Sequence, residues 1–247
     1  MPSAHAPTPS GVTAFVHGVA RLWNERLSDD LAGVYLIGSL AHGGFSARYS
    51  DIDMAIIVRR PLAAPDLEQI GVQMAAQWPD LAPKLSLFWS DDAFLTGRFP
   101  PLDRIDYLDH GAPLIERRRV RPERPTLPDV RRYLRGDPLA TWSRRTLLLS
   151  EHRGLHDGDH KVYLRALLYP ARFIYSWDTG KVASNDDAVG YVEARNIPGF
   201  DIDLVKRALR CRNAGEDLLP LFPERHKLPD LARICAEYAA WSGRGEY

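Results

Sequence analysis

The sequence predicts an α+β protein, in which a small mixed β-sheet with flanking helices is followed by an α-helical bundle. Short apolar runs of strand length alternate with helical patterns in the first half of the 247 residues. Residues 117–128 are rich in proline and arginine and have no periodicity, and every strong pattern after them is helical. We therefore expect a disordered tail over 1–10, a sheet domain over 11–120 and a helical domain over 121–247.

The elements expected in the sheet domain follow in chain order. Apolar side chains at helical spacing over 12–23 predict a first helix, and 33–39 and 51–58 predict two short strands around a loop of small residues. Residues 66–78 predict a helix with an acidic first turn, and 84–90 predict a third strand.

The last segment of the sheet domain and the helical domain complete the prediction. Residues 104–118 predict a strand, a turn at Asp109, His110 and Gly111, and a second strand. Many of the later helical patterns begin at Asp or Ser and end near Gly, as helix caps do. The expected helices cover 129–136, 139–154, 159–180, 184–196, 201–215 and 228–241.

Bulk composition bounds the function. The 32 basic residues balance 32 acidic ones, so no global field favours nucleic acid or an anionic membrane. No run approaches the roughly 18 apolar residues of a membrane span, and the N-terminal residues lack the pattern of a signal peptide. We expect a cytoplasmic protein without nucleic-acid or membrane partners.

Two aspartates in the second strand carry the most informative chemistry. Asp51 and Asp53 are two residues apart, so in a strand their carboxylates project from the same face. Two unpaired carboxylates would repel each other, whereas Mg²⁺ takes oxygen ligands and leaves positions for phosphate. Upstream, Gly38 allows a close backbone approach and Ser39 adds a hydroxyl and N–H donors. An edge strand with solvent-facing acids would also explain Asp-x-Asp alone, but the Gly-Ser pair favours a metal-nucleotide site.

This combination resembles a known superfamily. An apolar-Gly-Ser pattern, a gap of about ten residues and Asp-apolar-Asp-apolar are typical of the polymerase-beta-like nucleotidyltransferases, and residues 33–58 match this pattern. The resemblance implies that the aspartates hold Mg²⁺ and that NMP passes from a nucleoside triphosphate to a hydroxyl with release of pyrophosphate. It predicts a nucleotide site, with Mg²⁺-ATP as the expected ligand. The residues of this site are Gly38, Ser39, Ser50, Asp51 and Asp53.

A second resemblance lies in the helical half. Residues 171–192 are similar to the C-terminal domain of the streptomycin/spectinomycin-type aminoglycoside adenylyltransferases. Arg172 then corresponds to an arginine that contacts the nucleotide phosphates, a role that suits its fork of donors, although a surface arginine fits the pattern equally well. Asn185 stands where the family has a second phosphate-contacting lysine, and Lys181 is the alternative cation.

The sequence departs from the superfamily at the third acid. Relatives usually carry an acidic residue on the next strand, often as the base that activates the acceptor. Here alternation places Lys84 and Ser86 on that face, with Ser86 at the more probable position. Serine is a poor general base near neutral pH, so Asp106 is the candidate substitute, with a solvent-facing hairpin position as the alternative.

Acceptor binding has weaker support in the sequence. Residues 121–247 hold 21 basic and 18 acidic groups and have no acidic bias for a polycationic acceptor. Trp142, Glu151 and Asp178 are candidates for a local acceptor pocket, whereas core packing and helix capping are the plainer interpretation. His152, His156 and His160 have the spacing of metal ligands on one helix, but intervening glycines favour a loop.

Three functions remain open from the sequence. The first is a Mg²⁺-dependent O-nucleotidyltransferase, with AMP transfer from ATP as the expected reaction, that modifies a small molecule such as an aminoglycoside-like antibiotic or a specialised metabolite. The second is a protein-modifying nucleotidyltransferase of antitoxin type. The third is a non-catalytic nucleotide-binding relative that has lost the third carboxylate.

Overall fold

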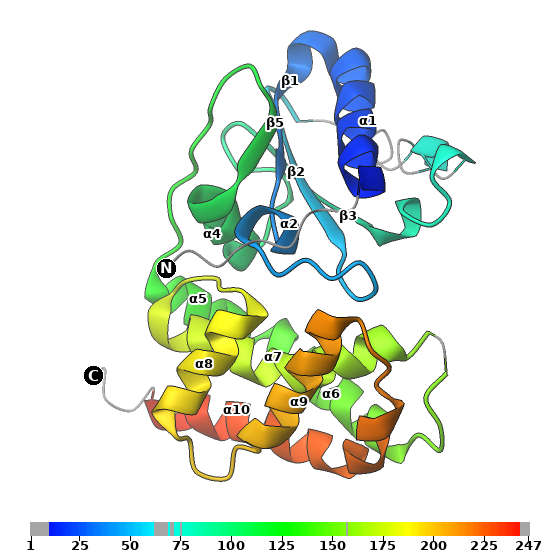
Figure 1. The fold of residues 1–247 in the computed structure, drawn as a ribbon. Coiled ribbons are helices and arrows are strands. Elements are labelled where there is room, and N and C mark those ends of the chain that lie inside the picture. Colours follow the sequence, from blue (N-terminus) through cyan, green and yellow to red (C-terminus); the bar gives the residue numbers. More distant parts are fainter. Residues whose placement is uncertain (1–9, 62–68, 70–71, 75, 157, 243–247) are drawn as a thin grey trace. The chain divides into compact units, whose positions relative to one another are not determined.

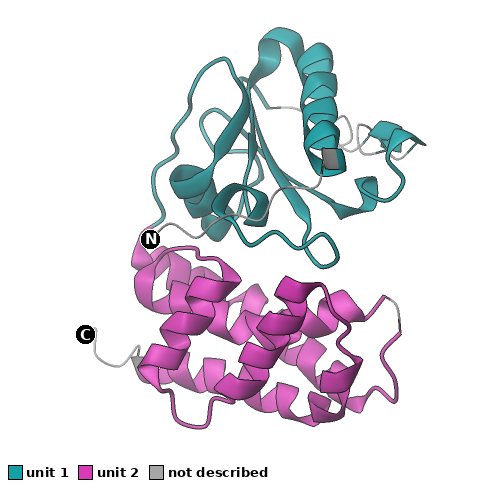
Figure 2. Cartoon of the chain, in the orientation of Figure 1, with its two compact units in different colours: residues 1–125 teal, residues 126–247 magenta. Residues whose placement is uncertain are grey.

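The chain folds into two compact units. The computed structural model describes residues 10–61, 69, 72–74, 76–156 and 158–242. Unit 1 is Met1–Pro125 and unit 2 is Thr126–Tyr247 (Figure 2). No helix among the described residues is long and apolar enough to cross a membrane.

A mixed β-sheet forms the centre of unit 1. Its strand order is β4-β3-β2-β1-β5, where β2 and β3 are parallel and the other neighbours are antiparallel. The predicted α+β class with a small mixed sheet is therefore confirmed. The strands are β1 (Leu31–Leu36), β2 (Ile52–Val58), β3 (Leu85–Asp91), β4 (Gly97–Arg98) and β5 (Ala112–Glu116).

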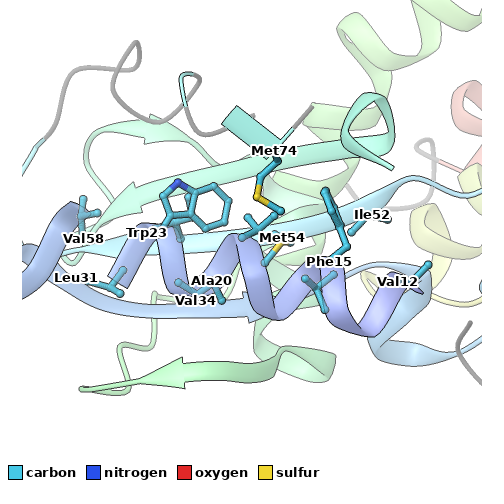
Figure 3. Close-up of a cluster of buried hydrophobic side chains, with 13 residues drawn as sticks. Val12, Phe15, Ala20, Trp23, Leu31, Val34, Ile52, Met54, Val58 and Met74 are labelled. Carbon is cyan, nitrogen blue, oxygen red and sulfur yellow. The ribbon is translucent and has the colours of Figure 1, made fainter. Parts of the chain in front are cut away.

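Helix α1 (Ser10–Leu27) covers one face of the sheet. Its apolar side chains recur every three or four residues, so they form one stripe that packs against side chains of β1 and β2 (Figure 3). Met74 adds to the same cluster. The fully or nearly fully buried members on α1 are Val12, Phe15, Val16, Val19, Ala20 and Trp23.

Helix α4 (Pro101–His110) lies on the opposite side of the sheet (Figure 1). Tyr107 packs edge-on against Tyr35 of β1, with ring centroids 4.9 Å apart. Phe94 and Phe99 join them in a second core cluster that also contains the β2 residues Ala55 and Ile57. Alternate residues of β2 therefore face α1 and α4, as strand geometry requires.

Helix α4 corrects the predicted hairpin over 104–118. Ile105 and Tyr107 alternate with polar neighbours as in a strand, but both are buried on a helix that begins at Pro101. Proline is favoured at the first helical positions because it has no N–H to leave unsatisfied. The helix ends where the Gly111 N–H donates to the Tyr107 carbonyl, and only β5 is a strand in this segment.

About half of the predicted helix over 66–78 lies outside the described residues. Within this span, residues 69, 72–74 and 76–77 are helical, and Trp78 is described but lies outside the helix. Short elements complete unit 1: the 3-10 turns Ser28–Asp30 and Ala82–Lys84, and the one-turn helix α2 (Ser39–His42).

Unit 2 is a bundle of helices around α7, as the sequence predicts. Helix α7 packs against α5, α6, α8, α9 and α10, and its buried side chains include Trp177. Side chains cap several N-termini: Thr126 and Asp129 form a reciprocal capping box, and Ser184 and Asp201 accept backbone N–H groups. The elements are α5 (Leu127–Arg135), α6 (Asp137–Glu151), α7 (His160–Thr179), α8 (Asn185–Arg195), α9 (Ile202–Ala214), the 3-10 segment Leu219–Lys227 and α10 (Leu228–Ser242).

Candidate nucleotide site

A tight turn at Gly38 follows β1. The Ile37 N–H donates to the Asp53 carbonyl at 3.1 Å, which sets Gly38 beside Asp53. Gly38 has φ of 67°, a left-handed conformation that side chains disfavour. A Cβ atom at Gly38 would lie 2.3 Å from Asp53 Oδ2. The turn and the carboxylate therefore fit together only because residue 38 is glycine.

Helix α2 continues this turn. The Ala41 and His42 N–H groups donate to the Gly38 carbonyl at 2.9 and 3.1 Å. Within the described part of the chain, neither the Ser39 N–H nor its hydroxyl makes a hydrogen bond, and Ser39 is partly exposed. Ser39 therefore offers two donors beside Gly38.

Asp51 immediately precedes β2 and Asp53 is the second residue of β2, so the two aspartates occupy alternate positions. Ile52 and Met54 are fully buried on the α1 side, whereas Asp51 and Asp53 have the parity of Ala55, which faces α4. Both aspartates are partly exposed. Their carboxylates thus lie on the same face of the sheet as α4 and remain accessible.

Ser50 has a local role in the loop before Asp51. Its hydroxyl accepts the Ser46 N–H at 2.9 Å, and the Ser50 N–H donates to the Ser46 carbonyl at 2.8 Å. Ser50 is buried. These two bonds close the loop before Asp51.

Ser86 lies beside Asp53 in the sheet. The parallel register of β2 and β3 pairs Asp53 with Ser86, while Lys84 precedes β3 and donates to the Ala47 carbonyl in the loop. The residue that the sequence resemblance indicated as the equivalent of the third acid is therefore a serine next to Asp53.

Asp106 reaches the turn from helix α4. Its Oδ2 accepts the Gly38 N–H at 2.5 Å, and its Oδ1 lies 4.0 Å from His42 Nε2. The residue is 5% exposed. A helix, and not a predicted hairpin, thus brings Asp106 to Gly38, because Asp106 occupies the side of α4 that faces the sheet.

His42 is a residue of this corner that sequence reasoning did not single out. Its ring packs edge-on against His110, with centroids 5.3 Å apart, and its side chain is 9% exposed. The available signal was its position four residues after Gly38, at the end of the one helical turn that the Gly-Ser pair opens.

The described residues suit a metal ion only as part of a larger complex. No group of three His, Cys, Asp or Glu among them could hold a metal ion. Asp51 and Asp53 supply hard oxygen ligands, and Mg²⁺ characteristically takes one or two carboxylates together with water and substrate phosphates. The pair fits a metal-nucleotide complex better than a permanent metal cage.

Asp178 in unit 2 is held by its neighbours. Its Oδ2 accepts the hydroxyls of Tyr191 at 2.9 Å and Tyr238 at 2.8 Å, and Arg195 Nη2 lies 3.4 Å away. Burial and the hydrogen bond to Asp178 raise the pKa of both tyrosines, so they remain donors at neutral pH. The three contacts give Asp178 a structural role between α7, α8 and α10.

The other residues singled out in unit 2 lie on α6, on α7 and in the turn after α7. Trp142 of α6 stacks on Tyr169 at 5.0 Å and is covered by Arg145. Arg172 is an exposed residue of α7, and Glu151 is exposed at the end of α6. Lys181 is exposed after the turn, where its N–H donates to the Thr179 hydroxyl.

The three histidines near residue 156 do not form a metal site among the described residues. His152 Nδ1 lies 3.6 Å from Asp159, and His160 Nδ1 lies 3.5 Å from Asp217. His152 ends α6 and His160 begins α7, so a loop separates them as the glycines predicted.

The fold as a whole is similar to that of a solved adenyltransferase. The structure of spectinomycin adenyltransferase AAD(9) from Enterococcus faecialis, solved with ATP and spectinomycin, matches with a TM-score of 0.62. The match covers 90% of this chain and 99% of that one. The chain shares the fold of this spectinomycin adenyltransferase. The architecture inferred from the two sequence resemblances is thereby confirmed, at 16% sequence identity. No family model and no curated protein matches the chain.

Proposed function

We propose that the chain is an O-nucleotidyltransferase that transfers AMP from ATP to a hydroxyl of a small molecule such as an aminoglycoside-like antibiotic. The observation that carries the proposal is the corner in which Gly38, with no room for a side chain, lies against Asp53 and beside the two donors of Ser39. The fold shared with a protein solved with ATP and spectinomycin supports the same substrate classes.

Each group of the corner has a distinct task in this reaction. Asp51 and Asp53 would hold Mg²⁺, which supplies positive charge to the phosphates when bound. Ser39 donates hydrogen bonds to a phosphate oxygen. The acceptor oxygen forms a bond to the α-phosphorus, the bond to the β-phosphate oxygen breaks, pyrophosphate leaves and the hydroxyl proton passes to solvent. The protein then acts mainly by positioning and by electrostatic stabilisation.

The residues of unit 2 belong to the same proposal. Arg172 and Lys181 are the proposed phosphate contacts, and both are exposed cations. Trp142, Glu151 and Asp178 are the proposed acceptor contacts. For Asp178 and Trp142, a contact with the acceptor would come in addition to the internal contacts that they already make.

A second candidate function follows from Ser86. Its place beside Asp53 leaves this face of β3 without the usual acid, which favours a nucleotide-binding protein that has lost catalysis. The variant Ser86→Glu distinguishes the two functions. It should raise turnover if the chain has lost catalysis, and it should change turnover little if the chain is already an active enzyme.

Pyrophosphate release from ATP and Mg²⁺ tests the proposal against a panel of hydroxylated acceptors that includes aminoglycosides and spectinomycin. The wild-type chain should release pyrophosphate with at least one acceptor, and Asp51→Asn or Asp53→Asn should reduce the rate by about 10²-fold or more. Full activity in both variants would exclude the proposed site. If the wild-type chain binds ATP without releasing pyrophosphate, and Ser86→Glu restores the release, the chain is a nucleotide-binding protein that has lost catalysis.

A further inference from the structure

The carboxylate of Asp106 is bound to the backbone of the Gly-Ser turn. Its Oδ2 accepts the Gly38 N–H at 2.5 Å, a short distance for an N–H donor. Hydrogen bonds to ionised acceptors are shorter and about twice as strong as neutral ones. The contact therefore ties the turn to helix α4, a part of the chain 68 residues away.

The second oxygen of Asp106 is buried without a hydrogen bond. Oδ1 has no hydrogen-bond partner among the described residues, and His42 Nε2 lies 4.0 Å from it. A buried carboxylate with one unsatisfied oxygen is costly, and a hydrophobic residue on the sheet-facing side of α4 would avoid that cost. The acid at this position thus calls for an explanation beyond packing.

The contacts around Gly38 divide the donors of the turn. Asp106 takes the Gly38 N–H on one side, while Asp53 Oδ2 fills the place of a side chain on the other. Ser39 keeps its N–H and hydroxyl, which make no hydrogen bond within the described part of the chain. With Gly38 fixed from both sides, the Ser39 N–H keeps one direction before any ligand binds, and the Ser39 hydroxyl beside it can rotate toward the ligand.

We propose that Asp106 is a positioning residue that holds the Gly38–Ser39 turn ready for a phosphate group, and that it is not the general base. This inference rests on the proposed function for the identity of the ligand. It follows from the burial of both carboxylate oxygens: Oδ2 is bonded to the Gly38 N–H, Oδ1 is buried beside His42, and the residue is 5% exposed, so neither oxygen is open to an acceptor hydroxyl. It also replaces the catalytic role that the sequence suggested for Asp106.

Asparagine and alanine at position 106 separate the two roles. Asp106→Asn keeps an oxygen that accepts the Gly38 N–H but cannot act as a base, whereas Asp106→Ala removes the acceptor. If Asp106→Ala does not unfold cooperatively in a thermal melt, Asp106→Ser takes its place, because the serine hydroxyl is too short to reach Gly38.

The first measurement is calorimetric titration with Mg²⁺ and a non-hydrolysable ATP analogue. We expect Asp106→Asn to bind within about threefold of wild type and Asp106→Ala to bind about tenfold more weakly. The kcat for pyrophosphate release should be retained in Asp106→Asn. Equal binding by wild type and Asp106→Ala would overturn the positioning role, and an Asp106→Asn variant that binds normally but loses about 10²-fold in kcat would restore the base.

The second measurement needs no nucleotide and keeps this inference separate from the proposed function. Amide hydrogen exchange at Gly38 should accelerate in Asp106→Ala and stay near wild type in Asp106→Asn. If wild type binds no nucleotide, the proposed function fails while the exchange result still decides whether Asp106 holds the turn. Unchanged exchange in Asp106→Ala would contradict the inference.

Discussion

The residues singled out in unit 1 and those in unit 2 differ in how the fold uses them. In unit 1, Gly38 lies against Asp53 and donates its N–H to the Asp106 carboxylate, so the turn after β1 contacts both β2 and α4. In unit 2, Asp178 and Trp142 are bonded or stacked to neighbours within the bundle, and Arg172 and Lys181 are exposed. The unit 1 residues contact one another and so define a site geometry that supports a specific chemistry. The unit 2 residues share suitable side-chain types but no common geometry.

The largest expected effect breaks the corner in unit 1. Gly38→Ala places a Cβ 2.3 Å from Asp53 Oδ2 in a backbone conformation that only glycine adopts easily. Misplacing the turn by a fraction of an ångström should weaken nucleotide binding by about 10²-fold in calorimetry.

Gly190→Ala in unit 2 is the matched control for Gly38→Ala. Gly190 is a helical residue of α8, and an added Cβ meets nothing within 4 Å. Alanine there should raise the free energy of unfolding by roughly 0.5–1 kcal/mol and leave nucleotide binding unchanged. Similar binding in both variants would mean that the Gly38 turn is not the nucleotide site.

An intermediate effect is expected at Asp178. Asp178→Ala leaves the Tyr191 and Tyr238 hydroxyls without their acceptor, so the free energy of unfolding should fall by about 1–3 kcal/mol in urea titrations. Asp203→Ala is the control, because Asp203 is exposed in the first turn of α9 and should change stability by less than about 0.5 kcal/mol. A stable Asp178→Ala variant with weakened acceptor binding would favour the acceptor role.

The smallest effect concerns pH and is confined to unit 2. Burial opposes ionisation of Asp201, but hydrogen bonds from Lys227 and the Leu204 N–H lower its pKa, and the Lys227 bond also lowers the pKa of Glu224. A carboxyl with a lowered folded pKa stabilises the fold above its unfolded pKa, near 3.9 for Asp and 4.3 for Glu, and this contribution is lost as pH falls below those values.

Lys227→Met tests that linkage. The variant should lose less stability than wild type between pH 5 and pH 3 when melting temperatures are compared, because both carboxyls lose the Lys227 cation while Glu224 keeps its ion pair with Arg207. Lys206→Met is the control: Lys206 bonds to exposed Glu193 at 2.6 Å, and this surface pair should not alter the acid profile. An unchanged profile for Lys227→Met would remove the assigned cause of the shifts.

Some of these features follow from local sequence and others do not. Asp51, Asp53, Gly38 and the helices of unit 2 are predictable because strand alternation, turn chemistry and helical spacing act over a few residues. The first strand of the hairpin predicted over 104–118 was wrong, because the alternation of Ile105 and Tyr107 outweighed the helix start signalled by Pro100 and Pro101.

Local sequence patterns do not predict contacts between residues that are far apart in the chain. Asp106 meets Gly38 across 68 positions, and Asp178 meets Tyr238 across 60. Both depend on how helices pack, which a local pattern does not specify. The sequence thus predicted that Asp51 and Asp53 share one face of the sheet, but not which acids on the helices make structural hydrogen bonds.

Calorimetric titration of ATP into wild type and Asp53→Asn, each with and without Mg²⁺, tests the central claim most directly. The account predicts binding to wild type that weakens about tenfold or more when Mg²⁺ is left out, and an Asp53→Asn variant whose weaker binding no longer responds to Mg²⁺. Equal ATP affinity under all four conditions would contradict it.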